Sequence, residues 1–360
     1  MLKYRGNDEI SQDWPFLSII LVNLNGRRWL ETCLKSVLES DYPPDIMEVI
    51  LVDNGSIDGS VELARSICKD SRLKIVQNKR NLGWSPANNQ GMKIANGEII
   101  ICLSNDMIVD SLWLKEIINT MKLDPSVGIV QCNSISMWDR KSFDSGMNFL
   151  DKYGFAYSYA PQKRPQQVFF AEGMAFAIRR YVFDEIGGFD DYYFMEYDDM
   201  DLSWRARLAG YKVFFCPTSI VYHARGGTVG GTYFVKNIRN IVQYVRNHFV
   251  TLIKNYSTTS LLQILPIVLA VQCVKVLFFI RRRNPKLIAA TLKGMLLVLN
   301  DAKLVIQKRN EIQHRIRKVS DREIMHSMHP FIPKLLQLFL ASQAEGRRLV
   351  LNSHPPVKSD

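Results

Sequence analysis

Hydrophobic residues between Leu17 and Val130 form short apolar runs, and stretches with helical spacing separate these runs. Short apolar runs between turn residues are typical of buried strands, while apolar residues that recur every three or four positions indicate amphipathic helices. The expected strands are Leu17–Val22, Val49–Val52, Leu73–Val76, Ile99–Leu103 and Val127–Val130. The helices expected between them are Arg27–Ser40, Gly59–Lys69, Pro86–Ala95 (opened by its proline) and Ser111–Met121. This alternation predicts a doubly wound α/β fold.

The pattern is less regular after Val130. Residues 133–170 are rich in Tyr, Phe, Ser and Gly, which indicates irregular strands and loops. Regular periodicity returns further along the chain. We expect a helix at Met200–Ala209, strands around Val213–Phe215 and Ile220–Tyr222, and a long helix at Tyr233–Ile253.

The C-terminal third contains long apolar stretches. Leu261–Ile280 is long enough to span a bilayer, and Arg281–Arg283 follow it directly. However, Lys275 falls within this stretch, and a central lysine costs about 2.5–3.5 kcal/mol on insertion scales. We therefore expect helices that lie in the headgroup region of a membrane instead of crossing it. Two further apolar stretches are Leu287–Leu299 and Phe331–Leu340.

The net charge of +11 is concentrated in the same third of the chain. Residues 251–360 hold 18 of the 46 Lys and Arg residues but only 6 of the 35 Asp and Glu residues. A basic region of this kind indicates a polyanionic partner. Because its charges are interleaved with aliphatic runs and not with aromatic residues, we expect an anionic membrane surface and no nucleic acid. The alternative is a helical subdomain that packs on the catalytic core or on a second subunit.

Cysteine usage and the N-terminus bear on the cellular compartment. The 6 cysteines lack the spacing of a zinc site, and thiols within apolar runs are typical of a reducing compartment. Met1–Trp14 is polar and has no apolar segment of the secretory type, so we expect the catalytic part in the cytoplasm. The expected divisions are an N-terminal extension (1–16), a catalytic domain (17–255), a basic and apolar helical region (256–345) and a flexible tail (346–360).

Polar residues follow three of the expected strands. Asn23 comes after the first strand, Asp53 after the second and Asp106 after the fourth. Open α/β sheets bind ligands outside the carboxyl ends of their strands, where an acid can accept bonds from a nucleotide base or a ribose. A carboxylate in this place can also bind Mg²⁺, which needs one or two carboxylates in addition to phosphate oxygens. Each segment alone also fits an ordinary turn or helix cap.

Two further segments join charge to a helix N-terminus. Asn81–Asn89 leads from a glycine-containing loop into a helix, whose free N–H groups favour an anion such as a diphosphate. Three acids, Asp198, Asp199 and Asp201, repel one another unless they serve a helix N-terminus, a cation or catalysis. Asp201 is spaced for an i,i+4 pair with Arg205, which indicates a structural role for Asp201.

Taken in order, these segments form a recognisable set. The set VNLNG, VDNGS, NLGWSPANNQG, LSND, EGMAFAIRR, DDMDLSWRARLAGY and VYH resembles the family 2 inverting glycosyltransferases with the GT-A fold, and is most similar to their rhamnosyltransferase-like branch. The resemblance covers the chain from Ser18 to Asn255. It implies a Rossmann-like, mostly parallel sheet with flanking helices, a nucleotide-sugar donor and a divalent metal, Mg²⁺ or Mn²⁺.

The resemblance also implies residue roles on the donor side. Asp53 is expected to hold the base or ribose of the nucleotide, and Asn23 and Asn81 to line the same pocket. Asp106 matches the last acid of the family's Asp-x-Asp metal motif and is expected to contact both the donor and the metal. Ser104 stands at the position of the first acid, which leaves one carboxylate in the motif.

The remaining roles concern the metal and the acceptor. A lone histidine after a strand is more often a packed residue than a ligand, but His223 matches a position that can ligate the metal. Gly173 matches a loop on the acceptor side, and Trp204 is assigned to the same side. Asp198 and Asp199 match a Glu-Asp catalytic pair whose second acid, Asp199, is the base; the first acid is shortened here from Glu to Asp.

These groups predict one reaction type. Asp199 takes the proton of the acceptor hydroxyl as that hydroxyl attacks the anomeric carbon, and one displacement inverts the anomeric centre. We expect a lipid-linked or cell-envelope glycan as the acceptor and a peripheral or monotopic protein at the cytoplasmic face of the membrane, either alone or as a homo-oligomer. One alternative is a sugar nucleotidyltransferase, whose Gly- and Arg/Lys-rich loop only Gly26–Arg28 resembles. The other is a non-catalytic nucleotide-sugar-binding protein, against which the carboxylates of Asp106 and Asp199 argue.

Overall fold

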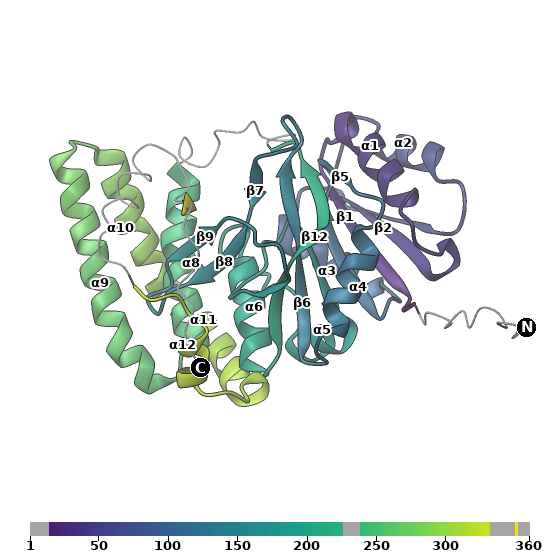
Figure 1. The fold of residues 1–360 in the computed structure, drawn as a ribbon. Coiled ribbons are helices and arrows are strands. Elements are labelled where there is room, and N and C mark those ends of the chain that lie inside the picture. The colour runs from purple at the N-terminus through teal and green to yellow at the C-terminus, as the bar shows by residue number, and fades with distance from the viewer. Residues whose placement is uncertain (1–13, 226–237, 332–349, 352–360) are drawn as a thin grey trace, which may run out of the picture.

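The fold was analysed in a computed structural model that describes residues 14–225, 238–331 and 350–351. Figure 1 shows a twisted sheet with helices on both faces and a group of helices from the C-terminal third beside it. The N-terminal extension up to residue 13, the apolar stretch Phe331–Leu340 beyond Phe331 and most of the expected tail lie outside the described residues, as do residues 226–237.

The predicted α/β fold is confirmed in the first half of the chain. The first four strands are β1 (Leu17–Asn23), β2 (Met47–Asp53), β3 (Leu73–Gln77) and β4 (Ile99–Ser104). They pair in parallel in the order β4-β1-β2-β3, and β1 and β2 are buried at every position. Burial on both faces explains why these strands are continuous apolar runs and do not alternate.

Helices cover the two faces of this sheet with separate hydrophobic cores. They are α1 (Arg27–Leu38), α2 (Ser60–Ile67), α3 (Trp84–Ile94) and α4 (Trp113–Lys122). Helices α1, α2 and α4 contribute to one core, and α3 contributes to the other. Helix α3 begins at Trp84, so Pro86 lies in its first turn and not at its first position. A proline in the first turn breaks no helical hydrogen bond.

The second half of the sheet is mixed in direction. Strand β11 (Ala175–Arg179), which the sequence pattern did not predict, lies antiparallel between β4 and β6 (Val127–Ser136). Strand β12 (Lys212–His223) pairs in parallel with β6 and has a bulge between Cys216 and Ile220. The two strands expected at Val213–Phe215 and Ile220–Tyr222 are therefore one strand. Pro217, which lacks an N–H group, accounts for the interruption.

Short strands occupy the region where irregular strands and loops were expected. They are β7 (Phe143–Ser145), β8 (Met147–Leu150), β9 (Ala156–Tyr159) and β10 (Gln166–Gln167). A further short strand, β5 (Met107–Val109), follows β4 and pairs with β12. Strands β8 and β9 form a separate small sheet with β13 (Val350–Leu351). The segment following β11 is a helix, α5 (Arg180–Ile186), and a short 3-10 turn, Pro44–Ile46, precedes β2.

The C-terminal third is helical, and its first helix packs against α6 (Asp198–Leu208). The helices are α8 (Ile238–Asn255), α9 (Thr258–Arg281), α10 (Pro285–Asn300), α11 (Ala302–Glu311), the π-helical turn Ile312–Ile316 and α12 (Asp321–His326). Helix α8 corresponds to the expected helix Tyr233–Ile253, whose residues before 238 lie outside the described part of the chain. Helix α9 alone among the described helices is long and apolar enough to cross a membrane.

Candidate active site

The polar residues at the ends of β1 and β2 form one hydrogen-bonded cluster. Asn23 Nδ2 donates to Asp53 Oδ1 at 3.0 Å and to Ser56 Oγ at 3.0 Å. Asp53 Oδ2 accepts from the backbone N–H of Ser56 at 3.0 Å. Asn105, which follows β4, donates to Asn23 Oδ1 at 2.6 Å. Because the carboxyl ends of parallel strands share one edge of the sheet, residues far apart in sequence come together there.

Asn81 lies beside this cluster and connects to it through Asn54. Asn54 Nδ2 donates to Asn81 Oδ1 at 2.8 Å and to the carbonyl of Gly83 at 3.1 Å. Gly83 precedes α3 with a φ of +98°, a conformation that favours glycine. Asn81 itself is exposed. Hydrogen bonds from Asn54 therefore hold the loop before α3 against the end of β2, and the exposed side-chain amide in this loop is that of Asn81.

Asp106 and His223 meet at the ends of β4 and β12. Asp106 Oδ1 lies 3.3 Å from His223 Nε2 and accepts from Ser104 Oγ at 2.6 Å. His223 Nδ1 lies 2.8 Å from Asp144 Oδ2, and Arg225 forms a further ion pair with Asp144. Burial lowers the pKa of His223, but the two carboxylates outweigh burial and raise the pKa to about 9. The imidazole is thus held between two acids, one at each ring nitrogen.

This arrangement fits a divalent cation. Two ligand atoms that each lie ~2.1 Å from one cation are about 3 Å apart, close to the separation of Asp106 Oδ1 and His223 Nε2. A carboxylate on the other ring nitrogen, as Asp144 provides, is the usual way to orient a ligating histidine. Among the described residues no group of three or more His, Cys, Asp or Glu side chains could hold a metal. The site therefore offers two ligands, and donor phosphates would have to complete the coordination.

Asp199 lies at the N-terminus of α6, next to Gly173. The backbone N–H of Gly173 donates to Asp199 Oδ2 at 3.2 Å, and the N–H of Met200 donates to Asp199 Oδ1 at 2.8 Å. A Cβ atom at Gly173 would lie 3.4 Å from Trp84 Nε1 and 3.6 Å from Asp199 Cβ, so glycine leaves room between them. Gly173, which the sequence places on the acceptor side, is therefore in contact with Asp199, the predicted base.

Neighbouring acids change the protonation of Asp199. Burial raises the pKa of Asp199, and the nearby carboxylates of Asp198 and Glu172 raise it further, to about 8. Asp198 is buried and accepts from Ser85 Oγ at 2.9 Å. Glu172 is also buried. A carboxyl group with a pKa near the working pH can both accept and release a proton, which is the property of a general base.

A strained turn directly before α6 sets the position of Asp198 and Asp199, the first residues of this helix. Glu196 and Tyr197 have φ values of +66° and +67°, which residues with side chains rarely adopt. Asn247 of α8 is fully buried and donates to the carbonyls of Met195 at 2.8 Å and Glu196 at 2.9 Å. The Tyr197 ring stacks on that of His248, with centroids 5.5 Å apart. Helix α8 therefore holds the turn in its strained conformation and fixes the direction of the first residues of α6.

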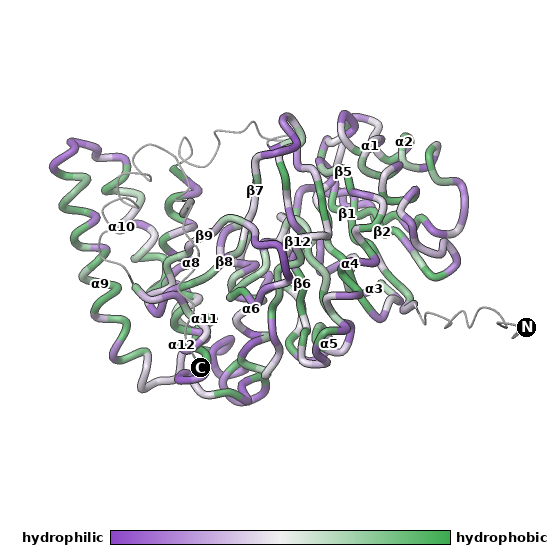
Figure 2. Tube along the Cα trace, in the orientation of Figure 1, coloured by the Kyte–Doolittle hydropathy of each residue, from purple (hydrophilic) through white to green (hydrophobic). Residues whose placement is uncertain are grey.

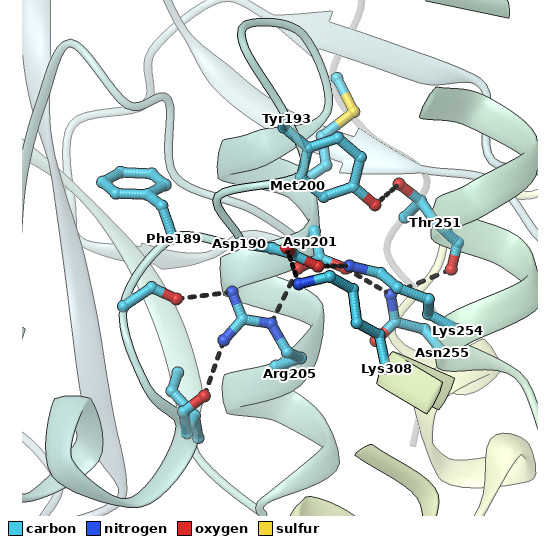
Figure 3. A network of polar contacts seen from close by, with 12 residues as sticks. Phe189, Asp190, Tyr193, Met200, Asp201, Arg205, Thr251, Lys254, Asn255 and Lys308 are labelled. Atoms are coloured by element: carbon cyan, nitrogen blue, oxygen red, sulfur yellow. Dashed lines mark hydrogen bonds and ion pairs between the residues drawn. The ribbon is translucent and has the colours of Figure 1, made fainter. Parts of the chain in front are cut away.

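Asp201, on the first turn of α6, joins a buried ionic network (Figure 3). Its carboxylate accepts from Arg205 Nε at 2.8 Å and from Asn255 Nδ2 at 2.9 Å, and lies 2.9 Å from Lys254 Nζ. Asp201 and Lys254 are both fully buried. The predicted i,i+4 pair between Asp201 and Arg205 is confirmed, and two residues of α8 extend it.

The same network reaches α11 through Asp190. Lys254 pairs with one oxygen of Asp190, and Lys308 of α11 lies 2.5 Å from the other oxygen. Asp190 precedes the strained turn in sequence, so cations from two C-terminal helices fix both ends of the segment that carries Asp199. The C-terminal helices are therefore part of the support of the candidate site.

One assigned residue lies away from these clusters. Trp204 is fully buried on α6, where its ring packs edge-on against Phe169 at 5.4 Å and Tyr256 at 4.8 Å. The structure does not bring Trp204 to the surface on which an acceptor could lie, and we assign it a packing role instead. Conversely, Asp144 and Trp84 lie at the candidate site but were not predicted from the sequence. No local pattern marks Asp144, whereas Trp84 lies inside the NLGWSPANNQG segment.

Comparison with known proteins shows a family match over part of the chain. Residues 18–187 match the model of Glycosyl transferase family 2. The poly-beta-1,6-N-acetyl-D-glucosamine synthase of Staphylococcus epidermidis is 25% identical over 219 residues, which are 60% of this chain and 51% of that protein. Glycosyltransferase AglE of Haloferax volcanii is 26% identical over 210 residues, 58% of this chain and 67% of that protein. The chain thus spans about half the length of the Staphylococcus synthase.

A solved structure extends the similarity to nearly the whole chain. Mannosyltransferase PcManGT from Pyrobaculum calidifontis, determined in complex with GDP-Man and Mn²⁺, aligns with a TM-score of 0.54 over 93% of this chain and 87% of that chain. At 19% identity this likeness concerns the fold alone. Residues 18–187 thus match a family 2 glycosyltransferase domain, and the mixed α/β fold of the chain is GT-A-like.

Proposed function

We propose that this protein transfers a sugar from a nucleoside-diphosphate sugar to a hydroxyl acceptor, with inversion at the anomeric carbon and with a divalent cation. The observation that carries the proposal is the position of Asp199, at the N-terminus of α6, beside Gly173 and near the buried carboxylates of Asp198 and Glu172. Burial and these two acids raise the pKa of Asp199 to about 8, so the group can take the proton of an attacking hydroxyl as the pH approaches that value. No separate nucleophile for a double displacement is evident from the sequence.

The donor side follows from the clusters at the strand ends. We assign Asn23, Asp53 and Asn81 to the nucleotide, because they meet at the carboxyl edge of the sheet, where open α/β folds bind ligands. Asp106 and His223 would hold Mg²⁺ or Mn²⁺. Once bound, the cation neutralises charge that develops on the diphosphate leaving group. Asp144 keeps His223 oriented toward this point.

The acceptor and its location form the finer part of the proposal. The similarity to a poly-beta-1,6-N-acetyl-D-glucosamine synthase supports a cell-envelope or lipid-linked glycan as the acceptor. Within the family we propose the rhamnosyltransferase-like branch and transfer of a hexosyl or rhamnosyl unit, because the motif set from VNLNG to VYH is most similar to that branch. We further propose that the protein works at the cytoplasmic face of a membrane, as a peripheral or monotopic protein, alone or as a homo-oligomer.

A donor panel tests the proposed activity. Purified full-length protein is incubated with UDP-, GDP- or dTDP-sugars and a membrane extract, and release of the nucleoside diphosphate is measured. We expect one nucleotide class to give release that depends on the extract, and we expect the transferred sugar to have the opposite anomeric configuration from the donor. Release of pyrophosphate from a nucleoside triphosphate and a sugar phosphate would instead indicate a nucleotidyltransferase.

Loss of the metal site is expected to weaken donor binding. Asp106→Ala removes the carboxylate that faces His223 Nε2, so calorimetry should show loss of the metal-dependent part of donor affinity, on the order of tenfold or more. EDTA should abolish transfer by the wild type. Asp41→Ala, which removes a surface carboxylate paired with Lys115, is the control and should bind the donor normally. A wild-type rate that EDTA leaves unchanged would disprove the metal role even if Asp106 matters.

A further inference from the structure

Helix α9 buries two of its polar side chains and exposes many of its apolar ones, although Gln263 is also exposed. Gln272 and Lys275 are each only 2% exposed and face the rest of the protein together with Ile264, Val268 and Phe279. The side chains on the opposite face are apolar and exposed: Leu262, Ile267, Leu269, Val274, Leu277 and Ile280. A surface helix of a protein in water shows the reverse pattern. The exposed face of α9 is thus suited to an apolar medium.

The neighbouring helices extend this apolar face. Helix α10 exposes Leu292, Leu296 and Leu299, and α11 exposes Leu304 and Ile306. Leu262, Leu277, Leu296 and Leu299 are between 60% and 72% exposed. Figure 2 shows α9 as mostly hydrophobic along its length. Isolated exposed leucines are ordinary, but an apolar face shared by neighbouring helices indicates an interaction surface.

The charges next to this face have one sign. Residues 258–300, which form α9, α10 and the turn between them, contain no Asp or Glu. The turn carries Arg281, Arg282, Arg283 and Lys286, all exposed. In the view of Figures 1 and 2 this turn is hydrophilic and lies at the upper end of the molecule, where the carboxyl ends of the sheet strands also lie. A basic cluster beside an apolar helix face matches an anionic headgroup layer next to acyl chains.

We propose that the outer faces of α9 and α10, with the Arg281–Lys286 turn, form a docking surface for an anionic lipid membrane. Helix α9 lies in the interface and does not cross the bilayer, because its inner face carries Gln272 and Lys275 and packs against the protein. The proposal rests on the membrane location proposed above and deepens it by naming the lipid class and the surface that binds it; lipid binding itself requires neither donor nor acceptor. It places the edge of the sheet that carries the candidate active site at the same end as the headgroup contacts.

Charge also favours lipid over a second copy of this chain as the occupant. A dimer through this face would bury apolar area, but residues 258–300 offer no carboxylate to pair with the arginines of the other copy. An anionic bilayer supplies both an apolar layer and phosphate charge. The apolar face then contacts the apolar layer while the arginines pair with lipid phosphates.

Vesicle sedimentation with matched leucine variants tests the proposal. Full-length protein is mixed with vesicles of phosphatidylcholine, with or without phosphatidylglycerol. We expect the wild type to sediment with the anionic vesicles and far less with the neutral ones. Leu277→Glu on α9 should lower the partition coefficient by about tenfold or more, since burial of one leucine contributes at least that factor. Leu123→Glu, at the end of α4, is the control, because Leu123 is 61% exposed and Leu277 is 64% exposed.

A second variant tests the role of the arginines in the turn. A different occupant of the α9 and α10 surface would give a distinct result. Arg282→Ala combined with Arg283→Ala should remove most of the preference for anionic vesicles. Equal sedimentation of wild type and Leu277→Glu would overturn the proposal, as would a lipid-free dimer that Leu277→Glu dissociates. Resistance of the full-length protein to alkaline carbonate extraction would mean that α9 crosses the bilayer and would also overturn it. Donor binding measured without vesicles is expected to be equal in all variants, so failure here is separable from failure of the transferase assignment.

Discussion

Asp199→Asn is expected to lower the rate of sugar transfer by about 10²–10⁴-fold while donor binding remains nearly intact. Asparagine has almost the same shape and keeps the place of Asp199 beside Gly173, but it cannot take a proton from the acceptor hydroxyl. The free energy of unfolding should stay the same or increase slightly, because the native carboxylate is held among the carboxylates of Asp198 and Glu172. Steady-state kinetics and donor calorimetry on the same preparations measure both effects.

The dependence of the rate on pH gives an independent measure of the same group. Because the pKa of Asp199 is raised to about 8, most of this carboxyl is protonated below that pH and cannot act as a base. The kcat/KM of the wild type should therefore increase as pH rises through 8 and then level off. The residual activity of Asp199→Asn should lack this inflection. Near-normal turnover by Asp199→Asn would show that Asp199 is not the base. Asp198→Asn would then be the variant to measure.

The first half of the fold was accessible from sequence because its signals are local. Strands such as Ile99–Ser104 are buried on both faces and read as uninterrupted apolar runs. The position of the candidate site was accessible for a related reason. Parallel strands bring Asn23, Asp53 and Asp106 to one edge, and the strand ends can be located without knowing the strand order.

The second half of the sheet was less accessible because its strands are short or interrupted. Strand β11 spans only Ala175–Arg179 and runs into α5 without a turn residue between them. Strand β12 contains Pro217, which divides its apolar pattern in two. The long-range partners were not accessible either. Asp144 pairs with His223 across 79 positions, and Asn105 pairs with Asn23 across 82 positions, so no local pattern reports these contacts.

Helix α6 shows why the direction of the Trp204 side chain could not be predicted from sequence. Nine of its residues are buried: Asp198, Asp201, Leu202, Ser203, Trp204, Arg205, Ala206, Arg207 and Leu208. A helix that is surrounded by protein has no polar face from which the orientation of a side chain can be read. Asp201 was predictable as a structural residue through its spacing to Arg205. Its contacts with Lys254 and Asn255 depend on how α8 packs, which the local spacing does not encode.

Asp201→Asn is expected to be the most destabilising of the proposed changes, by about 3–5 kcal/mol in the free energy of unfolding. The variant keeps the shape of the side chain but removes the carboxylate that faces Arg205 and Lys254. Lys254 would then keep the carboxylate of Asp190, which also pairs with Lys308, whereas Arg205 would keep its hydrogen bonds to the carbonyls of Ile186 and Gly188. Urea unfolding followed by tryptophan fluorescence, with Trp204 packed on the same helix, measures the change.

The pH dependence of this effect and two matched variants identify its cause. Burial raises the pKa of Asp201, but Lys254 and Arg205 outweigh burial and leave the pKa below its ordinary value. The stabilisation is therefore present above the pKa of an unfolded aspartate, about 3.9, and is lost as pH falls further. Asp201→Asn should lack this loss, whereas Asp199→Asn, two positions earlier on α6, keeps Asp201 and should show it as the wild type does. Glu31→Gln, which breaks an exposed pair with Lys35, should leave the stability unchanged. If Asp201→Asn unfolds at the same urea concentration as Asp199→Asn, the network does not stabilise the segment that carries the catalytic acids.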